Sequence, residues 1–398
     1  MLETLKGGAD LGEGTILPLV DNILKEAIRR RASDIHLEPF RTTYRLRYRI
    51  DGNFLTLGEY PAELGHRLIA RLKVMSRLQV YKVSTPQEGR IHVNLGPGLD
   101  LRTSFFPTVN GEKLVIRIFS FASENLSLEA LGFETHILQG MKKLLASNQG
   151  NVFVVGPAGV GKTTTLYALL KEIYQSQGSY RSLATIEDPV ENNLGFLPQT
   201  EINSAMGLSF ATALRSLLRQ DPEVIMVGEI RDPETASIAV QAGLTGHLVL
   251  SSVHADRAFS IFARLIDLDC SLPLILASVA GILSQRLVRM LCPDCREEHQ
   301  YPHDLLSRYG LHGHTIFKSK GCPQCLGTGY LGRVAIGELL FVTREIKSAL
   351  RTNVACEDLE SVAVREGFIP LKEAARKLVI SGATSLEEVL PQFLEGGR

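Results

Sequence analysis

Residues 151–170, NVFVVGPAGVGKTTTLYALL, decide the fold of this chain. The apolar run Val152 to Val155 predicts a buried strand, and the glycine-rich segment after it opens a predicted helix. GPAGVGKT matches the phosphate-binding pattern G-x-x-x-x-G-K-[ST] in the strand–loop–helix context that this pattern requires. Glycines let backbone N–H groups curl around a phosphate, and the helix N-terminus adds partial positive charge. We therefore expect a nucleotide to bind here; the alternative is a chance match in a glycine-rich loop.

The pattern also predicts a role for each polar residue of the loop. Lys162 is expected to reach the β- and γ-phosphates of ATP, and the Thr163 hydroxyl is expected to hold Mg²⁺. The residues expected to contact the nucleotide are Gly156, Pro157, Ala158, Gly159, Val160, Gly161, Lys162, Thr163 and Thr164.

The composition is that of a globular protein with two or three domains. The 398 residues are 44% hydrophobic and 22% charged, which allows a proper core. Lys+Arg and Asp+Glu both number 43, and this zero net charge argues against nucleic acid as the main partner. The N-terminus lacks a signal-peptide pattern, and the longest apolar stretch, residues 272–283, is too short to span a bilayer. We expect a cytoplasmic protein that contacts the membrane peripherally, through partners.

The N-terminal part of the chain predicts a small α+β domain. Residues 1–15 are expected to be a flexible start, and residues 16–122 to form the domain. Residues 44–50 alternate apolar side chains with arginines, which is the period of a half-buried strand. The dipeptides Asp51-Gly52 and Asn110-Gly111 are hairpin signals.

The rest of the chain predicts an α/β core with additions at its C-terminal end. Across residues 126–291 the strand-like runs VFVV, SLATI, VIMVG and HLVLSSV alternate with helical stretches. This rhythm is typical of a mostly parallel sheet that is covered by helices. A cysteine module is predicted at residues 292–332 and a helical region at residues 333–398.

Three polar residues follow predicted strands of this core. Glu187 opens EDPVENN after SLATI, Glu229 follows VIMVG, and His254 follows HLVLSSV. The carboxyl ends of parallel strands are where such sheets bind ligands, so these residues are candidates for water activation and γ-phosphate sensing. The alternatives are a solvated turn for Glu187, a surface ion pair for Glu229 and a core histidine for His254.

Four of the six cysteines form two C-x-x-C pairs, CPDC and CPQC. Two such pairs at this separation are a strong signal for a tetrahedral Zn²⁺ site, and four sulfur ligands leave no open position, so the role would be structural. A redox pair is the alternative. The predicted zinc ligands are Cys292, Cys295, Cys322 and Cys325.

Further segments extend these motifs over nearly the whole chain. They are RASDIHLEP, RYRIDG, PQEGRI and DLRTSFFPTVNGEKLVIRI near the N-terminus, and QRLVRMLCPDC and CPQCLGTGYLGR around the cysteines. Together with EDPVENNLGFLPQTEIN, GPAGVGKTTTLYA, VIMVGE and TGHLVLSSVH, they resemble the secretion ATPase superfamily of type II secretion and type IV pilus assembly. The last four correspond to that family's Asp box, Walker A, Walker B and His box.

The resemblance implies a RecA-like P-loop NTPase core and an N-terminal PAS-like adaptor domain. It also implies a homo-hexamer, with ATP between the core of one subunit and the adaptor domain of the next. Arg90 and Arg102 match the family positions whose arginines reach the γ-phosphate, and Arg47 and Arg49 are second candidates. Glu187 is expected to polarise water and Glu229 to act on Mg²⁺ through water, although the reverse assignment stays open.

The resemblance further implies a motor that hydrolyses ATP to assemble a secretion pseudopilus or a pilus through an inner-membrane platform. The cysteine module favours assembly over retraction, and the adaptor domain is expected to move about a hinge near residues 119–126. The chain starts almost at the adaptor domain, so the resemblance does not extend to the family's usual mode of membrane recruitment. The alternatives are a nucleic-acid-translocating P-loop ATPase and a nucleotide-binding regulator without turnover.

Overall fold

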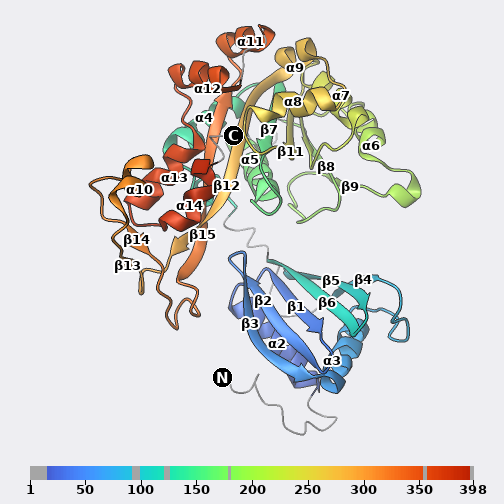
Figure 1. Ribbon diagram of the computed structural model, residues 1–398. Helices are drawn as coiled ribbons and strands as arrows, with labels where there is room; N and C mark the ends of the chain where they lie inside the picture. Colours follow the sequence, from blue (N-terminus) through green and yellow to red (C-terminus); the bar gives the residue numbers. More distant parts are fainter. Residues whose placement is uncertain (1–15, 92–98, 121–125, 178–180, 353–355, 395–398) are drawn as a thin grey trace. The chain divides into compact units, whose positions relative to one another are not determined.

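The chain divides into two compact units, Met1–Ser123 and Glu124–Arg398. A computed structural model describes residues 16–91, 99–120, 126–177, 181–352 and 356–394 (Figure 1). The predicted flexible start lies outside the described residues, as does most of the predicted hinge. Each unit has a sheet of its own.

The first unit is a six-stranded antiparallel sheet with two helices on one face, in the strand order β3-β2-β1-β6-β5-β4. Alternation along β2 buries Tyr44, Leu46 and Tyr48 against these helices. The intervening arginines therefore lie on the face that the helices leave uncovered. The elements are α2 (Ile16–Arg29), β1 (Asp34–Pro39), β2 (Thr43–Ile50), β3 (Asn53–Pro61), α3 (Ala62–Met75), β4 (Gln87–Ile91), β5 (Leu99–Thr108) and β6 (Gly111–Ser120).

Both predicted hairpins are present in this unit. Asp51 and Gly52 join β2 to β3 and both have positive φ, 47° and 89°, as the tight hairpin turn requires. The second turn differs by one residue from the prediction: Thr108 pairs with Gly111, so the connecting residues are Val109 and Asn110. Gly111 is already the first residue of β6.

The second unit contains a seven-stranded sheet in the order β15-β12-β7-β11-β10-β8-β9. All neighbours are parallel except β12 and β15, which confirms the predicted mostly parallel core. Its elements through the sixth strand of this sheet are α4 (Thr135–Leu145), β7 (Gly150–Val155), α5 (Lys162–Gln177), β8 (Leu183–Glu187), β9 (Gln199–Glu201), α6 (Phe210–Leu217), β10 (Val224–Val227), α7 (Pro233–Ala242), β11 (Leu248–Val253), α8 (Ser260–Asp267), α9 (Leu272–Ser278) and β12 (Val279–Leu291).

Helices cover both faces of this sheet. Val152 and Val154 of β7 pack in one core with α4 and α5, whereas Phe153 and Val155 pack in a second core with α6, α7, α8 and α9. Because alternate residues of a strand point to opposite faces, the continuous apolar run of β7 is the pattern of a strand that is buried on both sides.

The C-terminal part differs from the expected helical region. Residues 333–341 belong to β15 (Tyr330–Phe341), which pairs with β12 from Gly281↔Phe341 to Leu291↔Tyr330. The sheet therefore does not end at Leu291, and the cysteine module is an insertion between two neighbouring strands. This segment is a strand because it pairs with a strand distant in sequence, and local sequence patterns do not reveal such pairing. The remaining elements are β13 (Glu297–Glu298), α10 (His303–Arg308), β14 (Phe317–Lys318), α11 (Arg344–Arg351), α12 (Cys356–Arg365), α13 (Leu371–Ile380) and α14 (Leu386–Leu394).

Candidate nucleotide-binding and catalytic site

The carboxyl ends of four parallel strands meet at one edge of the second unit's sheet. β7 runs into the phosphate-binding loop, and Val155 at its end pairs with Val253 at the end of β11. β8 ends at Glu187, and Val227 at the end of β10 pairs with the residue before it. The predicted Walker A, Asp box, Walker B and His box segments are therefore brought to the same edge, where parallel sheets bind ligands.

The phosphate-binding loop has the backbone that its glycines permit. Gly156, Gly159 and Gly161 have φ of 148°, 79° and 86°, which side chains rarely tolerate. A Cβ on Gly156 would also lie 2.7 Å from the carbonyl oxygen of Gln285, so this position has no room for a larger residue. The loop leads directly into the N-terminus of α5, and a helix N-terminus is a ready anion site.

Lys162 is the first residue of α5, and its ammonium group is held by the loop itself. Its Nζ donates to the carbonyl oxygens of Gly156 and Pro157, each at 2.9 Å. Burial lowers its pKa, while the nearby charge of Glu229 works in the opposite direction. A buried, poorly solvated cation at a helix N-terminus suits the terminal phosphates of a nucleotide.

Gln285 on β12 fixes this loop, and the sequence analysis did not identify it. Its Nε2 donates to the Val160 carbonyl oxygen at 2.7 Å, and its Oε1 accepts from the Thr165 hydroxyl at 2.9 Å. The neighbouring Arg286 is also buried and donates to the carbonyl oxygen of Asp256 at 2.6 Å. The sequence did carry a signal for these two residues, because they are polar and lie inside the apolar segment GILSQRLV.

Glu187 is enclosed by hydrogen-bond donors. Only 2% of its surface is exposed. The Thr185 hydroxyl donates to its Oε1 at 2.6 Å and Gln199 Nε2 donates to the same oxygen at 2.9 Å, while the Tyr167 hydroxyl donates to Oε2. This carboxylate therefore ties α5 to β8 and to β9, and its oxygens are occupied by the protein.

Glu229 is the carboxylate that lies with Lys162 and His254. Its Oε2 is 3.7 Å from His254 Nε2, and its Oε1 pairs with Arg231 at 2.5 Å. The Ser252 hydroxyl holds the turn by donating to the Gly228 carbonyl oxygen at 2.6 Å. Burial and then the charge of Lys162 lower the pKa of His254, so its imidazole is neutral at pH 7.

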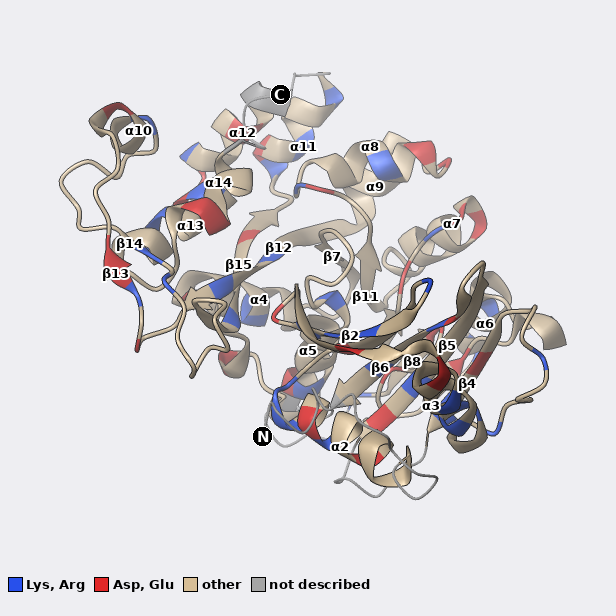
Figure 2. Cartoon of the chain, turned by 60° about the horizontal axis from the view of Figure 1, so that its bottom comes forward, with Lys and Arg blue, Asp and Glu red and all other residues tan. Residues whose placement is uncertain are grey.

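The predicted arginines of the first unit form a row across its uncovered sheet face. Arg90 of β4 pairs with Arg102 of β5, which pairs with Arg117 of β6. Arg102 is 3.1 Å from Asp100 and stacks on the Phe119 ring. The sequence analysis missed Arg117, although the alternation in KLVIRIF places it on this face. Figure 2 shows how the lysines and arginines are distributed along these strands.

The second-choice arginines lie farther along the same face, on β2. Arg47 pairs with Glu38 at 2.6 Å, and Arg49 is 3.5 Å from Asp34. Both also stack on the ring of Phe54. Arg102 is held in the same way, by Asp100 and the ring of Phe119, so these contacts do not separate the two pairs of candidates.

The four predicted cysteine ligands converge. Their sulfur atoms all lie within 4.8 Å of one another, and the closest Sγ–Sγ distances are 3.7 and 3.8 Å. Four sulfurs at the usual zinc–sulfur bond length around a tetrahedral ion are about 3.8 Å apart, so the cluster fits Zn²⁺. Burial alone would raise the pKa of Cys325, but the backbone N–H groups of Cys322 and Gly329 lower it to about 6, whereas burial raises the pKa values of Cys292 and Cys295. The fit to a metal therefore rests on the arrangement of the four sulfur atoms.

A family model described as type II/IV secretion system protein matches residues 9–391. The chain belongs to this family. Its relatives include the putative type II secretion system protein E of Escherichia coli (strain K12), 42% identical over 379 residues that cover 94% of this chain and 76% of that protein. The type IV pilus assembly ATPase PilB of Myxococcus xanthus (strain DK1622) is 39% identical over 391 residues, 95% of this chain and 68% of that protein.

Solved structures of related proteins agree with this family. The pilus retraction motor PilT with bound ADP aligns with a TM-score of 0.62 and 26% identity, over 93% of this chain and 96% of that one. The ATPase DotB of Legionella pneumophila aligns with a TM-score of 0.69 and 20% identity, over 96% of both chains, which supports the fold alone. Within the described residues, no helix is both long and apolar enough to cross a bilayer.

Proposed function

We propose that this protein is a cytoplasmic ATPase motor that drives assembly of a type II secretion pseudopilus or a type IV pilus. The observation that carries the proposal is the meeting of Lys162, Glu229 and His254 beside a phosphate-binding loop at the carboxyl edge of a parallel sheet. Relatives at about 40% identity are named as secretion proteins and pilus assembly ATPases, which supports the same reaction here.

Each residue of the site has a separate role in ATP hydrolysis. The backbone N–H groups of residues 156–164, apart from Pro157, and the Lys162 ammonium would bind the phosphates. The Thr163 hydroxyl would hold Mg²⁺, which would neutralise phosphate charge. We assign water activation to Glu229 rather than to Glu187, because the oxygens of Glu187 already accept hydrogen bonds inside the protein. His254 acts beside Glu229 as the neutral group that senses the γ-phosphate.

The motor requires more than one copy of the chain. In the proposed homo-hexamer, the PAS-like first unit of one subunit presents Arg90 and Arg102 to the nucleotide in the RecA-like core of its neighbour. A positive group near the γ-phosphate stabilises the charge that develops in phosphoryl transfer. The row Arg90–Arg102–Arg117 offers this charge on a face that its own helices leave uncovered.

The proposed partner is an inner-membrane platform protein, reached peripherally by the ring. A zinc ion held by Cys292, Cys295, Cys322 and Cys325 would stiffen the insertion between β12 and β15. By the family resemblance, such a module favours assembly over retraction. We expect no nucleic-acid partner because the chain carries no net charge.

Phosphate release by the purified full chain with Mg²⁺ and ATP tests the proposal. We expect steady turnover that Lys162→Ala abolishes while the circular dichroism spectrum stays unchanged, because the hydrogen bonds of the lysine ammonium go to the carbonyl groups of its own loop. Turnover by that variant at the parent rate would refute the site. Stimulation by DNA with a steep salt dependence would favour the nucleic-acid motor instead, and no turnover at all would favour the regulator.

A further inference from the structure

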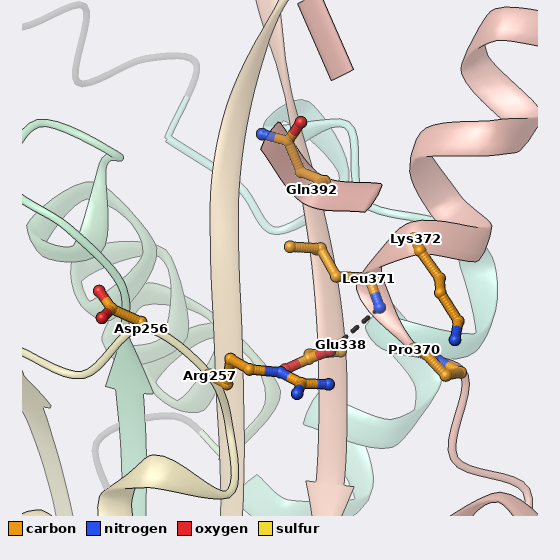
Figure 3. Close-up of a pocket in the computed structure, with 7 residues that line it drawn as sticks. All are labelled: Asp256, Arg257, Glu338, Pro370, Leu371, Lys372 and Gln392. Carbon is orange, nitrogen blue, oxygen red and sulfur yellow. Dashed lines mark hydrogen bonds between the residues drawn. The ribbon is translucent and has the colours of Figure 1, made fainter. Parts of the chain in front are cut away.

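Glu338 of β15 is a buried carboxylate that joins two segments distant in sequence. Only 2% of its surface is exposed. Its Oε1 accepts from the backbone N–H of Ala258 and its Oε2 from the backbone N–H of Leu371, each at 3.0 Å. Figure 3 shows Glu338 and its bond to Leu371. A carboxylate presents two acceptor oxygens at once, which neither an amide nor a hydroxyl does.

One of these segments belongs to the nucleotide site. Ala258 lies four positions after His254, and the intervening Asp256 accepts from Arg286 through its carbonyl oxygen. Arg286 follows Gln285, whose side chain holds the phosphate-binding loop. The Ala258 N–H is therefore part of a hydrogen-bonded path that begins at the loop.

The other segment opens a separate layer of the second unit. Leu371 is the first residue of α13, whose apolar face shares one core with α14 and with Leu311 and Ile316 of the cysteine insertion. A backbone hydrogen bond joins this layer to the end of β12: the Leu291 N–H donates to the carbonyl oxygen of Ala383, between α13 and α14, at 2.8 Å. We name α13, α14 and residues 292–329 the C-terminal body.

We propose that Glu338 is a positioning residue that couples the segment after His254 to the C-terminal body. Because one oxygen bonds Ala258 and the other bonds Leu371, a shift of the segment beside the nucleotide is passed on to the start of α13. The inference rests on the proposed nucleotide site and adds a route by which the state of that site reaches the cysteine insertion. A contiguous path is not itself coupling, so the test measures coupling directly.

The chain offers a matched pair of variants at Leu371. Proline is tolerated at the first position of a helix, and it has no N–H to donate to Glu338. Leu371→Pro therefore removes the bond together with the side chain, whereas Leu371→Ala removes only the side chain. Glu338→Gln breaks the bridge from the opposite side, since its amide keeps a single acceptor. Glu388→Gln is the control for Glu338→Gln, because Glu388 anchors α14 to Arg289 of β12 without touching the His254 segment.

The measurement is amide hydrogen exchange of the full chain with and without a non-hydrolysable ATP analogue, together with kcat and KM for ATP. In the parent, in Leu371→Ala and in Glu388→Gln, the analogue should slow exchange both at β7–α5 and in the first turn of α13. In Leu371→Pro and Glu338→Gln, the effect at β7–α5 should persist and the effect at α13 should vanish. For these two variants we expect kcat to fall about fivefold with little change in KM.

Several outcomes would overturn the coupling. They are an α13 response retained in either bridge-breaking variant, an α13 response lost equally in Leu371→Ala, or a parent chain in which the analogue never reaches α13. Because the two bridge-breaking changes lie on different segments, misfolding of one variant leaves the other to decide. Failure of the nucleotide site itself would be distinct, since the effect at β7–α5 would then be missing from the parent.

Discussion

At the scale of single residues, the two acidic candidates differ in what surrounds their oxygens. Glu187 is enclosed by Tyr167, Thr185 and Gln199, whereas the side chain of Glu229 keeps 15% of its surface exposed beside Lys162 and His254. A general base needs a lone pair within reach of its water, so the environment separates two carboxylates that their sequence positions made equivalent.

Substituting the two glutamates one at a time tests this distinction. Glu229→Gln should lower kcat by about a hundredfold or more with little change in the KM for ATP, because it removes the base but leaves the phosphate contacts. Glu187→Gln should instead destabilise the fold by about 1–3 kcal/mol, because an amide cannot satisfy all three donors. Steady-state kinetics and thermal unfolding of both variants give the comparison. A stable Glu187→Gln protein with the larger kcat loss would return the role to Glu187.

At the scale of elements, local signals predicted the parts that local chemistry decides. The phosphate-binding loop and the hairpin at Asp51-Gly52 were predictable because glycine and turn residues fix their backbones. β15 was not, because its partner strand lies beyond the whole insertion and only the pairing makes it a strand. The role of Gln285 could not be predicted for the same reason. Its side chain reaches the phosphate-binding loop only because β12 pairs with β7, and residue spacing along the chain does not reveal that pairing.

The cysteine insertion gives a prediction at this scale. Cys292→Ser should remove bound zinc and lower the midpoint of thermal unfolding by several degrees, because a tetrahedral site with three thiolates loses much of its affinity. Elemental analysis and a thermal melt measure the two effects. Cys270→Ser is the matched control, since Cys270 is also buried but lies outside the cluster. Equal zinc content in the two variants would contradict the assignment.

At the scale of the whole molecule, the proposed ring divides one active site between two chains. The carboxylates and the phosphate-binding loop belong to the second unit, whereas Arg90 and Arg102 belong to the first. If the arginines act on a neighbouring subunit, then defects in the two units should compensate when different chains are mixed.

Mixing two inactive variants makes this measurable. Lys162→Ala keeps its arginines, and Arg102→Ala, expected to lose about a thousandfold in kcat, keeps its phosphate-binding loop. Co-assembled, the two should recover a clear fraction of the parent phosphate-release rate, because some interfaces then combine both intact halves. Each variant mixed with itself provides the baseline. A mixture no faster than that baseline would place the arginines on the nucleotide of their own chain.

The row of three neighbouring arginines on β4, β5 and β6 should lower the stability of the first unit when no anion is bound. Like charges opposite one another on adjacent strands weaken a sheet, and Asp100 and Asp34 compensate only part of this row. Arg90→Thr, which relieves the crowding with a good strand former, should therefore melt at a higher temperature and turn over ATP more slowly than the parent. At this position, thermal stability favours the loss of the arginine, whereas ATP turnover favours keeping it.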